Sequence, residues 1–291
     1  MDLSFLNPEL PLDALKSPLS ADKALRIVVG HCLESIVLNA GKLASDDFGD
    51  EPVHQLRVGL RRLRSALHLF EGWAALPEPA VMGPLNRLFR HLGVVRDQTV
   101  LRALLRSLLR EAGPPQLSLP APKATPNPAL RVRSPEVQSA LLQLISFVSE
   151  GAPLAHPPHH GNALDVWMDK RLARWHRHIQ REGGHFAHLS ESRRHVLRKR
   201  VKTLRYGVEL VGVLFPPREV SRYLKQLHKL QDGLGRYVDL SLTLNWLQQD
   251  LPATPATTLA TTWLDIRRER QGEVCAEMLA RFKKMAPLRL S

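Results

Sequence analysis

The apolar residues of this chain recur at helical spacing over nearly its whole length. Positions i, i+3, i+4 and i+7 are apolar in segment after segment, whereas the period-two alternation of a half-buried strand is almost absent. This pattern predicts an all-α protein. The expected helices span residues 20–43, 51–74, 80–93, 97–112, 135–149, 163–182, 190–213, 218–233, 239–249 and 256–284.

Residue types at the expected helix ends agree with these boundaries. Ser20, Asp97 and Ser190 are the expected N-caps, because a short polar side chain can accept a hydrogen bond from an N–H of the first turn. Prolines stand where helices should stop, because the ring blocks the helical hydrogen bond and restricts the preceding residue. These prolines are Pro77, Pro79, Pro216, Pro217 and Pro252.

Proline-rich segments divide the chain into two helical parts. Seven prolines and few core residues fall between positions 113 and 135, which predicts a linker or mobile loop, and a second Pro/Gly-rich break follows at 151–161. We therefore expect a first helical half at 1–112, a linker at 113–134 and a second helical half at 135–291.

Two segments of the chain repeat one pattern. Residues 54–64 read His-Gln-Leu-Arg-Val-Gly-Leu-Arg-Arg-Leu-Arg, and residues 195–205 read His-Val-Leu-Arg-Lys-Arg-Val-Lys-Thr-Leu-Arg. A Leu-Gly-x-x-x-Asp segment follows each of them, at 92–97 and at 234–239. The matching order and spacing predict an internal duplication, with two copies of a unit of roughly four helices.

The repeated pattern places basic residues on one face of each motif helix, 51–74 and 190–213. At about 100° per residue, the four basic positions of a copy lie within an arc of about 80°. We call these two sets the basic stripes; they are His54, Arg57, Arg61 and Arg64 in the first copy, and His195, Arg198, Lys202 and Arg205 in the second. A separate apolar face of each helix is expected in the core. It comprises Val53, Leu56, Leu60, Leu63, Leu67 and Phe70, and Leu197, Val201, Leu204, Val208 and Val211.

Like charges stack along each stripe, whereas a helix charged only for solubility would alternate Glu with Lys at i, i+4. The stacking favours a multivalent anion lying along the helix, over about 15 Å from His54 to Arg64. Arginine suits this ligand because its guanidinium binds phosphate oxygens in bidentate fashion. The alternative is a solvated charged face, or arginines paired with acids of neighbouring helices. The candidate acids are Glu71, Asp97, Glu209 and Asp239.

Further basic residues extend the predicted anion site. Arg222, Lys225 and Lys229, followed by Arg236, lie on one face of a helix or its continuation, and Lys199 lies within the second motif. Looser counterparts in the first half are Arg87, Arg90 and Arg96.

Net charge indicates a polyanionic partner. The chain has 41 Lys and Arg against 28 Asp and Glu, a formal charge of +13, which raises the local concentration of polyanions. Nucleic acid remains an alternative, but only 5% of residues are aromatic and no stacking platform interleaves with the stripes. No helix-turn-helix signature appears either, so we consider nucleic acid unlikely.

Cysteine usage and the N-terminal residues predict a cytoplasmic protein. Cys32 and Cys275 lie far apart in apolar helical stretches, which suits two buried thiols in a reducing compartment. We expect no signal peptide and no membrane association, because no run approaches the ~20 apolar residues of a membrane span.

Catalytic signatures are missing from the sequence. There is no P-loop, Gly-x-Gly-x-x-Gly, His-Glu-x-x-His or Gly-x-Ser-x-Gly pattern, and no acidic cluster for magnesium. Five histidines lack the i, i+4 spacing of a helical zinc pair, so we expect no metal and no cofactor. They are His156, His159, His160, His185 and His188. A phosphorylatable histidine, His54 or His195, is the alternative that would make the protein a phosphotransfer module. Two copies amid stacked arginines favour anion binding, which histidine protonation would tune with pH.

The two His-x-Leu-Arg helices and the Leu-Gly-x-x-x-Asp segments resemble the CHAD family, the conserved histidine α-helical domain, over approximately residues 20–250. The resemblance implies two four-helix bundles related by a pseudo-twofold axis, with a basic groove or pore that binds inorganic polyphosphate. It assigns the anion site to the residues of both stripes. Lys225 and Lys229 look like further basic positions of the family, and Gly83 stands at the place of Lys225 in the first half. The Glu-x-Glu-x-Lys signature of the triphosphate-tunnel (CYTH) domain that many relatives carry is not found, so the chain looks like a stand-alone or excised CHAD unit.

Overall fold

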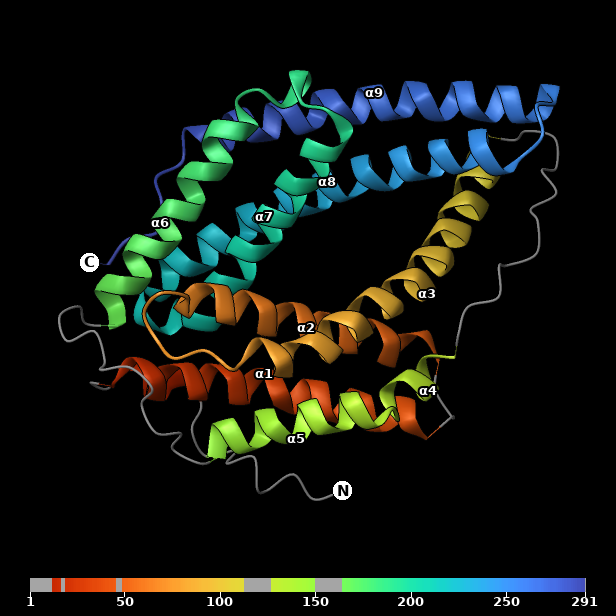
Figure 1. Ribbon diagram of the computed structural model, residues 1–291. Helices are drawn as coiled ribbons and strands as arrows, with labels where there is room; N and C mark the ends of the chain where they lie inside the picture. Colours follow the sequence, from red (N-terminus) through yellow and green to blue (C-terminus); the bar gives the residue numbers. More distant parts are fainter. Residues whose placement is uncertain (1–11, 17–18, 46–48, 113–126, 150–163, 291) are drawn as a thin grey trace.

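The computed structural model describes residues 12–16, 19–45, 49–112, 127–149 and 164–290. These residues form helices and turns and contain no strand, so the all-α prediction is confirmed. The α-helices are α1 (Ala21–Ala44), α2 (Asp50–Phe70), α3 (Pro79–Ala112), α4 (Pro128–Val132), α5 (Pro135–Ser149), α6 (Leu164–Gly183), α7 (Glu191–Val211), α8 (Pro217–Asp250) and α9 (Pro255–Lys283) (Figure 1). Short 3-10 helices occupy Leu12–Lys16, Phe186–His188 and Gly212–Leu214. Side chains of α3 are described up to Val95 and at Leu105.

Polar side chains cap four of the described helices, including α4, where the side-chain oxygen of Asn127 accepts a hydrogen bond from the Ala129 amide. The hydroxyl of Ser20 accepts a hydrogen bond from the Lys23 amide, and the hydroxyl of Ser190 accepts one from the Arg193 amide, as predicted. Thr254 forms a capping box at the start of α9, where Pro255 occupies the first turn. The prediction that Asp97 is an N-cap is wrong, because α3 runs through this position without interruption.

Two predicted helix breaks are absent from the structure. The segments 80–93 and 97–112 are one helix, α3, and the segments 218–233 and 239–249 are one helix, α8. The expected breaks lay at the two Leu-Gly-x-x-x-Asp segments. A glycine inside a helix lowers its stability by only about 1 kcal/mol relative to alanine, which tertiary packing can offset. Helix α2 ends earlier than predicted, at Phe70, where Gly72 follows with a positive φ of 77°.

The apolar faces of the motif helices lie in the core, as predicted. Leu56, Leu63 and Phe70 of α2 are fully buried, as are Leu197 and Leu204 of α7. Burying a side chain of this size stabilises the fold by about 1.5–3 kcal/mol. The two cysteines are also buried, and burial raises the pKa of Cys32 to about 12 and that of Cys275 to about 11, so both thiols remain protonated.

Helix packing produces two groups that meet through the motif helices. In one group, α1 packs against α2 and α5, and α3 packs against α2 and α5. In the other, α7 packs against α6 and α8, and α9 packs against α6 and α8 (Figure 1). The groups touch where α2 packs against α7 and again where α3 approaches α8. Leu105 of α3 joins a small apolar cluster with residues of α8 and α9 at this second contact.

The position of α5 differs from the predicted division of the chain. The sequence division placed residues 135–149 with the second half, but α5 packs against α1 and α3 of the first group, as does the short helix α4. The apolar face of α5, including Val137, Leu141 and Leu144, is buried there. Proline content marked a break near residue 113, but side-chain packing decides to which group the next helix belongs.

Helix α1 is the one described helix long and apolar enough to cross a membrane by length and composition. Core helices of soluble proteins have the same composition. In this structure α1 lies against α2 and α5, with Leu25, Val28 and Leu33 fully buried.

Candidate functional site

Three arginines of the first stripe gather around one aromatic ring. The guanidinium carbons of Arg57, Arg61 and Arg64 lie 4.9, 5.5 and 5.1 Å from the centre of the Phe89 ring on α3. Arg57 also donates a hydrogen bond of 3.1 Å from Nη1 to the carbonyl oxygen of Phe89. Cation–π attraction to one ring holds the three cations close together despite their mutual repulsion. Phe89 was not among the residues predicted for the site, and it is an aromatic partner of the first stripe.

The second stripe makes its contacts with α8 through polar groups. Arg198 forms an ion pair of 3.6 Å with Asp239, one of the predicted acidic partners. Arg205 donates a hydrogen bond of 2.8 Å from Nε to the side-chain oxygen of Gln231. Gln231 precedes Gly235 by four residues, just as Phe89 precedes Gly93 by four. This shared spacing is the sequence signal that could have identified both residues.

The glycine of each Leu-Gly-x-x-x-Asp segment gives room to an arginine of the stripe. A Cβ atom on Gly93 would lie 2.6 Å from Nη1 of Arg57, and one on Gly235 would lie 3.6 Å from Nη2 of Arg198. Both glycines are buried inside long helices. Gly93 is therefore needed to leave space for the Arg57 side chain on α3, whereas a Cβ atom at Gly235 would make only an ordinary contact with Arg198.

Packing of α2 against α7 brings the two stripes together around Lys202. Burial is the largest cause that lowers the pKa of Lys202 from its ordinary value of 10.5 to about 7. The charges of Arg61 on α2 and of Arg198 and Arg205 on α7 act in the same direction, and the carboxylate of Asp239 opposes them. Cations separated by more than 130 residues in sequence thus form one cluster.

An acidic residue takes part in the contact between the two motif helices. Glu209 of α7 forms an ion pair of 3.3 Å with Arg62 of α2, and a second with Arg205 of its own helix. Its carboxylate also lies 3.5 Å from Nε2 of His228 on α8. Glu209 was one of the predicted acidic partners, whereas Arg62 was not expected at the site.

The remaining predicted residues lie at different depths. His54 and His195, which begin the stripes, are half-buried, and neither is without a partner. Arg222 pairs with Glu219 of its own helix at 2.5 Å. The other predicted basic side chains are exposed, namely Arg87, Arg90, Lys199, Lys225 and Lys229. Asp97 and Arg96 lie in the part of α3 whose side chains are not described.

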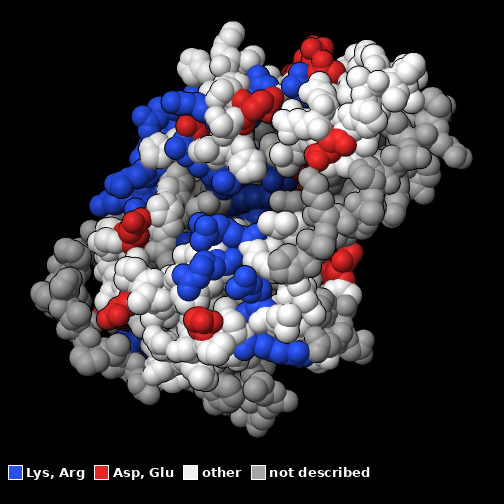
Figure 2. Space-filling view, turned by 45° about the vertical axis from the view of Figure 1, so that its right-hand side comes forward, with Lys and Arg blue, Asp and Glu red and all other residues white. Residues whose placement is uncertain are grey.

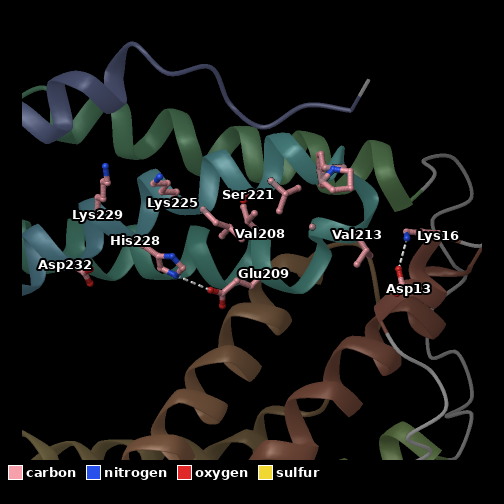
Figure 3. A pocket seen from close by; sticks show the side chains of 15 residues that line it. Asp13, Lys16, Val208, Glu209, Val213, Ser221, Lys225, His228, Lys229 and Asp232 are labelled. Atoms are coloured by element: carbon pink, nitrogen blue, oxygen red, sulfur yellow. Dashed lines mark hydrogen bonds and ion pairs between the residues drawn. The ribbon is translucent and has the colours of Figure 1, made fainter.

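A cavity of about 1020 Å³ adjoins the second stripe at the start of α8 (Figure 3). Its lining is mainly apolar and includes Val208, Val213 and Leu224, while Lys225 and Lys229 stand on its rim. Both lysines are exposed side chains of α8 and lie outside the two stripes.

Lys and Arg side chains gather across the middle of one face of the molecule, with few acidic residues between them (Figure 2). The arginines of the stripes supply hydrogen-bond donors that remain charged over a wide pH range, which suits the binding of phosphate groups. No group of three or more His, Cys, Asp or Glu side chains that could hold a metal occurs within the described ranges. His156, His159 and His160 lie outside these ranges.

Comparison with protein families gives this arrangement a name. The family model of the CHAD domain matches residues 27–248, more than half of the chain. The chain belongs to the CHAD domain family. No curated protein sequence matches it significantly.

Solved structures show the same fold for this CHAD domain. The crystal structure of the CHAD domain from the plant Ricinus communis is similar to it with a TM-score of 0.70 at 24% sequence identity, covering 95% of this chain and 96% of that one. PptA from Streptomyces chartreusis is similar with a TM-score of 0.63 at 17% identity, covering 92% of this chain and 100% of that one. At these identities the likeness establishes the fold and leaves the ligand to be argued from the site.

Proposed function

We propose that this CHAD domain binds inorganic polyphosphate, without catalysing a reaction on it, along the cations that α2 and α7 bring together. The observation that carries the proposal is the cluster of Arg61, Arg198, Lys202 and Arg205 around a half-buried position. Self-repulsion in such a cluster lowers the stability of the unliganded protein, and a multivalent anion removes it. Inorganic polyphosphate carries closely spaced charge and has no base that a protein must read.

The two helix groups fit the same proposal. We regard them as the two copies of a duplicated four-helix unit, because the arginine nearest the Leu-Gly glycine holds the same motif position in each, Arg57 beside Gly93 and Arg198 beside Gly235. The basic groove then lies where the motif helices of the copies face each other. We also propose that the protein is cytoplasmic and that this binding attaches it to polyphosphate granules.

The contacts of the site favour polyphosphate binding over two alternatives, namely nucleic-acid binding and a histidine phosphotransfer function. Single-stranded nucleic acid is bound largely by bases stacking on exposed aromatic rings. Phe89 is instead surrounded by three guanidinium groups, so its ring already has partners. A phosphotransfer module needs an exposed histidine, whereas His54 and His195 are half-buried beside arginines of the stripes.

A titration at two salt concentrations tests the proposed ligand. Long-chain polyphosphate should bind more tightly than duplex DNA of equal total charge and far more tightly than tripolyphosphate. The affinity should fall steeply with salt, because counterions are released on binding. Equal or tighter binding of DNA, or equal competition by orthophosphate and the long polymer, would contradict the proposal.

The two glycines of the Leu-Gly pairs provide a matched pair of substitutions. Gly93→Ala places a methyl group 2.6 Å from Nη1 of Arg57, which must leave its place over Phe89, so polyphosphate affinity should fall roughly fivefold. Gly235→Ala meets Arg198 only at 3.6 Å, an ordinary contact, and should leave the affinity unchanged. Thermal unfolding checks the fold, because alanine should stabilise either helix by up to about 1 kcal/mol. Equal affinities of the two variants would show that the position of Arg57 is immaterial.

A further inference from the structure

The basic stripe of α7 ends in a carboxylate. Arg198, Lys202, Arg205 and Glu209 follow one another at intervals of four, three and four residues, so they share one face of the helix. Glu209 lies 14 residues after His195, and the position 14 residues after His54 is His68. The second stripe is therefore followed by an acidic side chain and the first by a histidine.

Basic side chains from three helices surround the Glu209 carboxylate. Oε1 lies 2.5 Å from Nη1 of Arg205 on α7 and 3.5 Å from Nε2 of His228 on α8, and Oε2 lies 3.3 Å from Nη2 of Arg62 on α2. The side chain of Glu209 is only 18% exposed and that of Arg205 only 12%. Figure 3 shows the side chain of Glu209 on α7 beside the side chain of His228 on α8. Such an arrangement, with two guanidinium groups and an imidazole around one anionic group, also binds phosphate.

Arg64 of the first stripe, which corresponds to Arg205 in the repeat, differs from it in exposure and contacts. It is exposed and lies over the Phe89 ring, and it forms no ion pair with any residue that the structure describes. Arg205 instead donates from Nη1 to Glu209 and from Nε to Gln231, so the Glu209 carboxylate competes with a ligand for its Nη1 group. Arg62 is held by the same carboxylate.

We propose that Glu209 is an internal competitor of the polyanion, which occupies Arg62 and Arg205 and thereby limits how far bound polyphosphate extends along the second stripe. This inference rests on the proposed function. Glu209 lowers the affinity of the free site for any polyanion and, in exchange, relieves the repulsion between the two arginines at the contact of α2 with α7. It is thus a residue that determines affinity and the length of polymer bound.

Glu209→Gln is the direct test, with Glu182→Gln as its matched control. Glu182 pairs with Arg200 of α7 and is 22% exposed, so its substitution changes the net charge equally at a carboxylate of similar burial. Arg200 lies two residues from Arg198, on the opposite side of the helix from the stripe. Glu209→Gln should bind long-chain polyphosphate about five- to tenfold more tightly and steepen the salt dependence by about one counterion. Glu182→Gln should change the affinity less than about twofold.

A reciprocal substitution keeps the test decisive if Glu209→Gln does not fold. His68 is about half exposed, so His68→Glu and its control His68→Gln should both fold. The new carboxylate, four residues after Arg64, should pair with it and weaken polyphosphate binding about fivefold relative to His68→Gln. Equal binding by Glu209→Gln and Glu182→Gln, or by His68→Glu and His68→Gln, would overturn the role of Glu209.

Elution from a heparin column separates this inference from the proposed ligand. One outcome is that Glu209→Gln elutes at higher salt than Glu182→Gln while no variant binds polyphosphate more tightly than DNA. In that case polyphosphate is not the ligand, but Glu209 does compete with polyanions. If polyphosphate binds as proposed, but the two variants elute together and have equal affinity for it, the role of Glu209 is wrong and the proposed ligand is retained.

Discussion

Removing four cations from the two basic stripes should weaken the binding of long-chain polyphosphate about a hundredfold or more. The substitutions are Arg57→Gln, Arg61→Gln, Arg198→Gln and Lys202→Gln, combined in one chain. Each removes a charged donor at a half-buried position, and a hydrogen bond to a charged group contributes about 1.5–3 kcal/mol. Even after discounting for solvent screening and non-additivity, four such losses exceed the 2.7 kcal/mol of a hundredfold change, a figure that follows from ~1.4 kcal/mol per factor of ten. Fluorescence or calorimetric titration at fixed salt measures the affinity.

A control variant with the same change in net charge shows how much of the loss of affinity comes from long-range attraction rather than from contacts in the site. It carries glutamine at four exposed basic positions at the C-terminal end of the described chain, Arg270, Arg281, Lys283 and Lys284. This variant should lose less than about fivefold in affinity, because exposed charges farther away than a Debye length are largely screened. Comparable losses in both variants would mean that net charge alone attracts the polymer. Circular dichroism and the unfolding temperature establish that both variants fold.

Binding of polyphosphate should take up close to one proton at pH 8, through Lys202. In the free protein the pKa of Lys202 is about 7, because the side chain is partly buried and surrounded by Arg61, Arg198 and Arg205, with Asp239 opposing them. At pH 8 the amine is therefore mostly neutral. A phosphate group placed beside it favours the ammonium form and raises the pKa, so the complex binds a proton that the free protein lacks.

The sign of the pH dependence follows from this difference. Between pH 7 and the higher pKa of the complex, each rise of one pH unit should weaken binding by up to about tenfold. Below pH 7 Lys202 is charged in both states and contributes no further change. Calorimetry in buffers with different ionisation enthalpies counts the protons directly.

Two lysine substitutions on α7 make this prediction specific. Lys202→Arg keeps the charge at every pH in this range, so binding should persist while the proton uptake and the associated pH dependence disappear. Lys199→Arg changes an exposed lysine of the same helix and should retain both. Proton uptake that survives in Lys202→Arg would assign it to another group, such as His54 or His195.

The helices and the stripes were predictable because both are local properties of the chain. The period of the apolar residues placed α2 and α7 correctly, and their apolar faces, including Leu56 and Leu204, are buried as expected. The hydroxyl caps Ser20 and Ser190 could be read in the same way, since a cap involves residues within one turn. The likeness of the two motifs was equally visible, because it is a comparison of residue types at fixed spacing.

Predictions failed where packing overrides local preference. Helix breaks were predicted at residues 93–97 and 233–239, but each segment lies inside one long helix, and Gly93 leaves space there for an arginine of α2. Proline content placed residues 135–149 with the second half, whereas α5 buries its apolar face against α1 and α3. Local propensities of about 1 kcal/mol are smaller than the free energy gained by burying several apolar side chains.

The sequence by itself determined that the protein is helical, that its two motif helices carry stacked cations, and which residues form each stripe. Helical periodicity is set within a few residues, so a single chain displays it without any partner. Only the tertiary structure decided that Arg61 lies near Lys202, that Phe89 lies among three arginines, and that Glu209 occupies Arg62 and Arg205. These contacts join residues that lie up to about 150 positions apart, and they depend on how the side chains of α2, α3, α7 and α8 pack together, which no local pattern specifies.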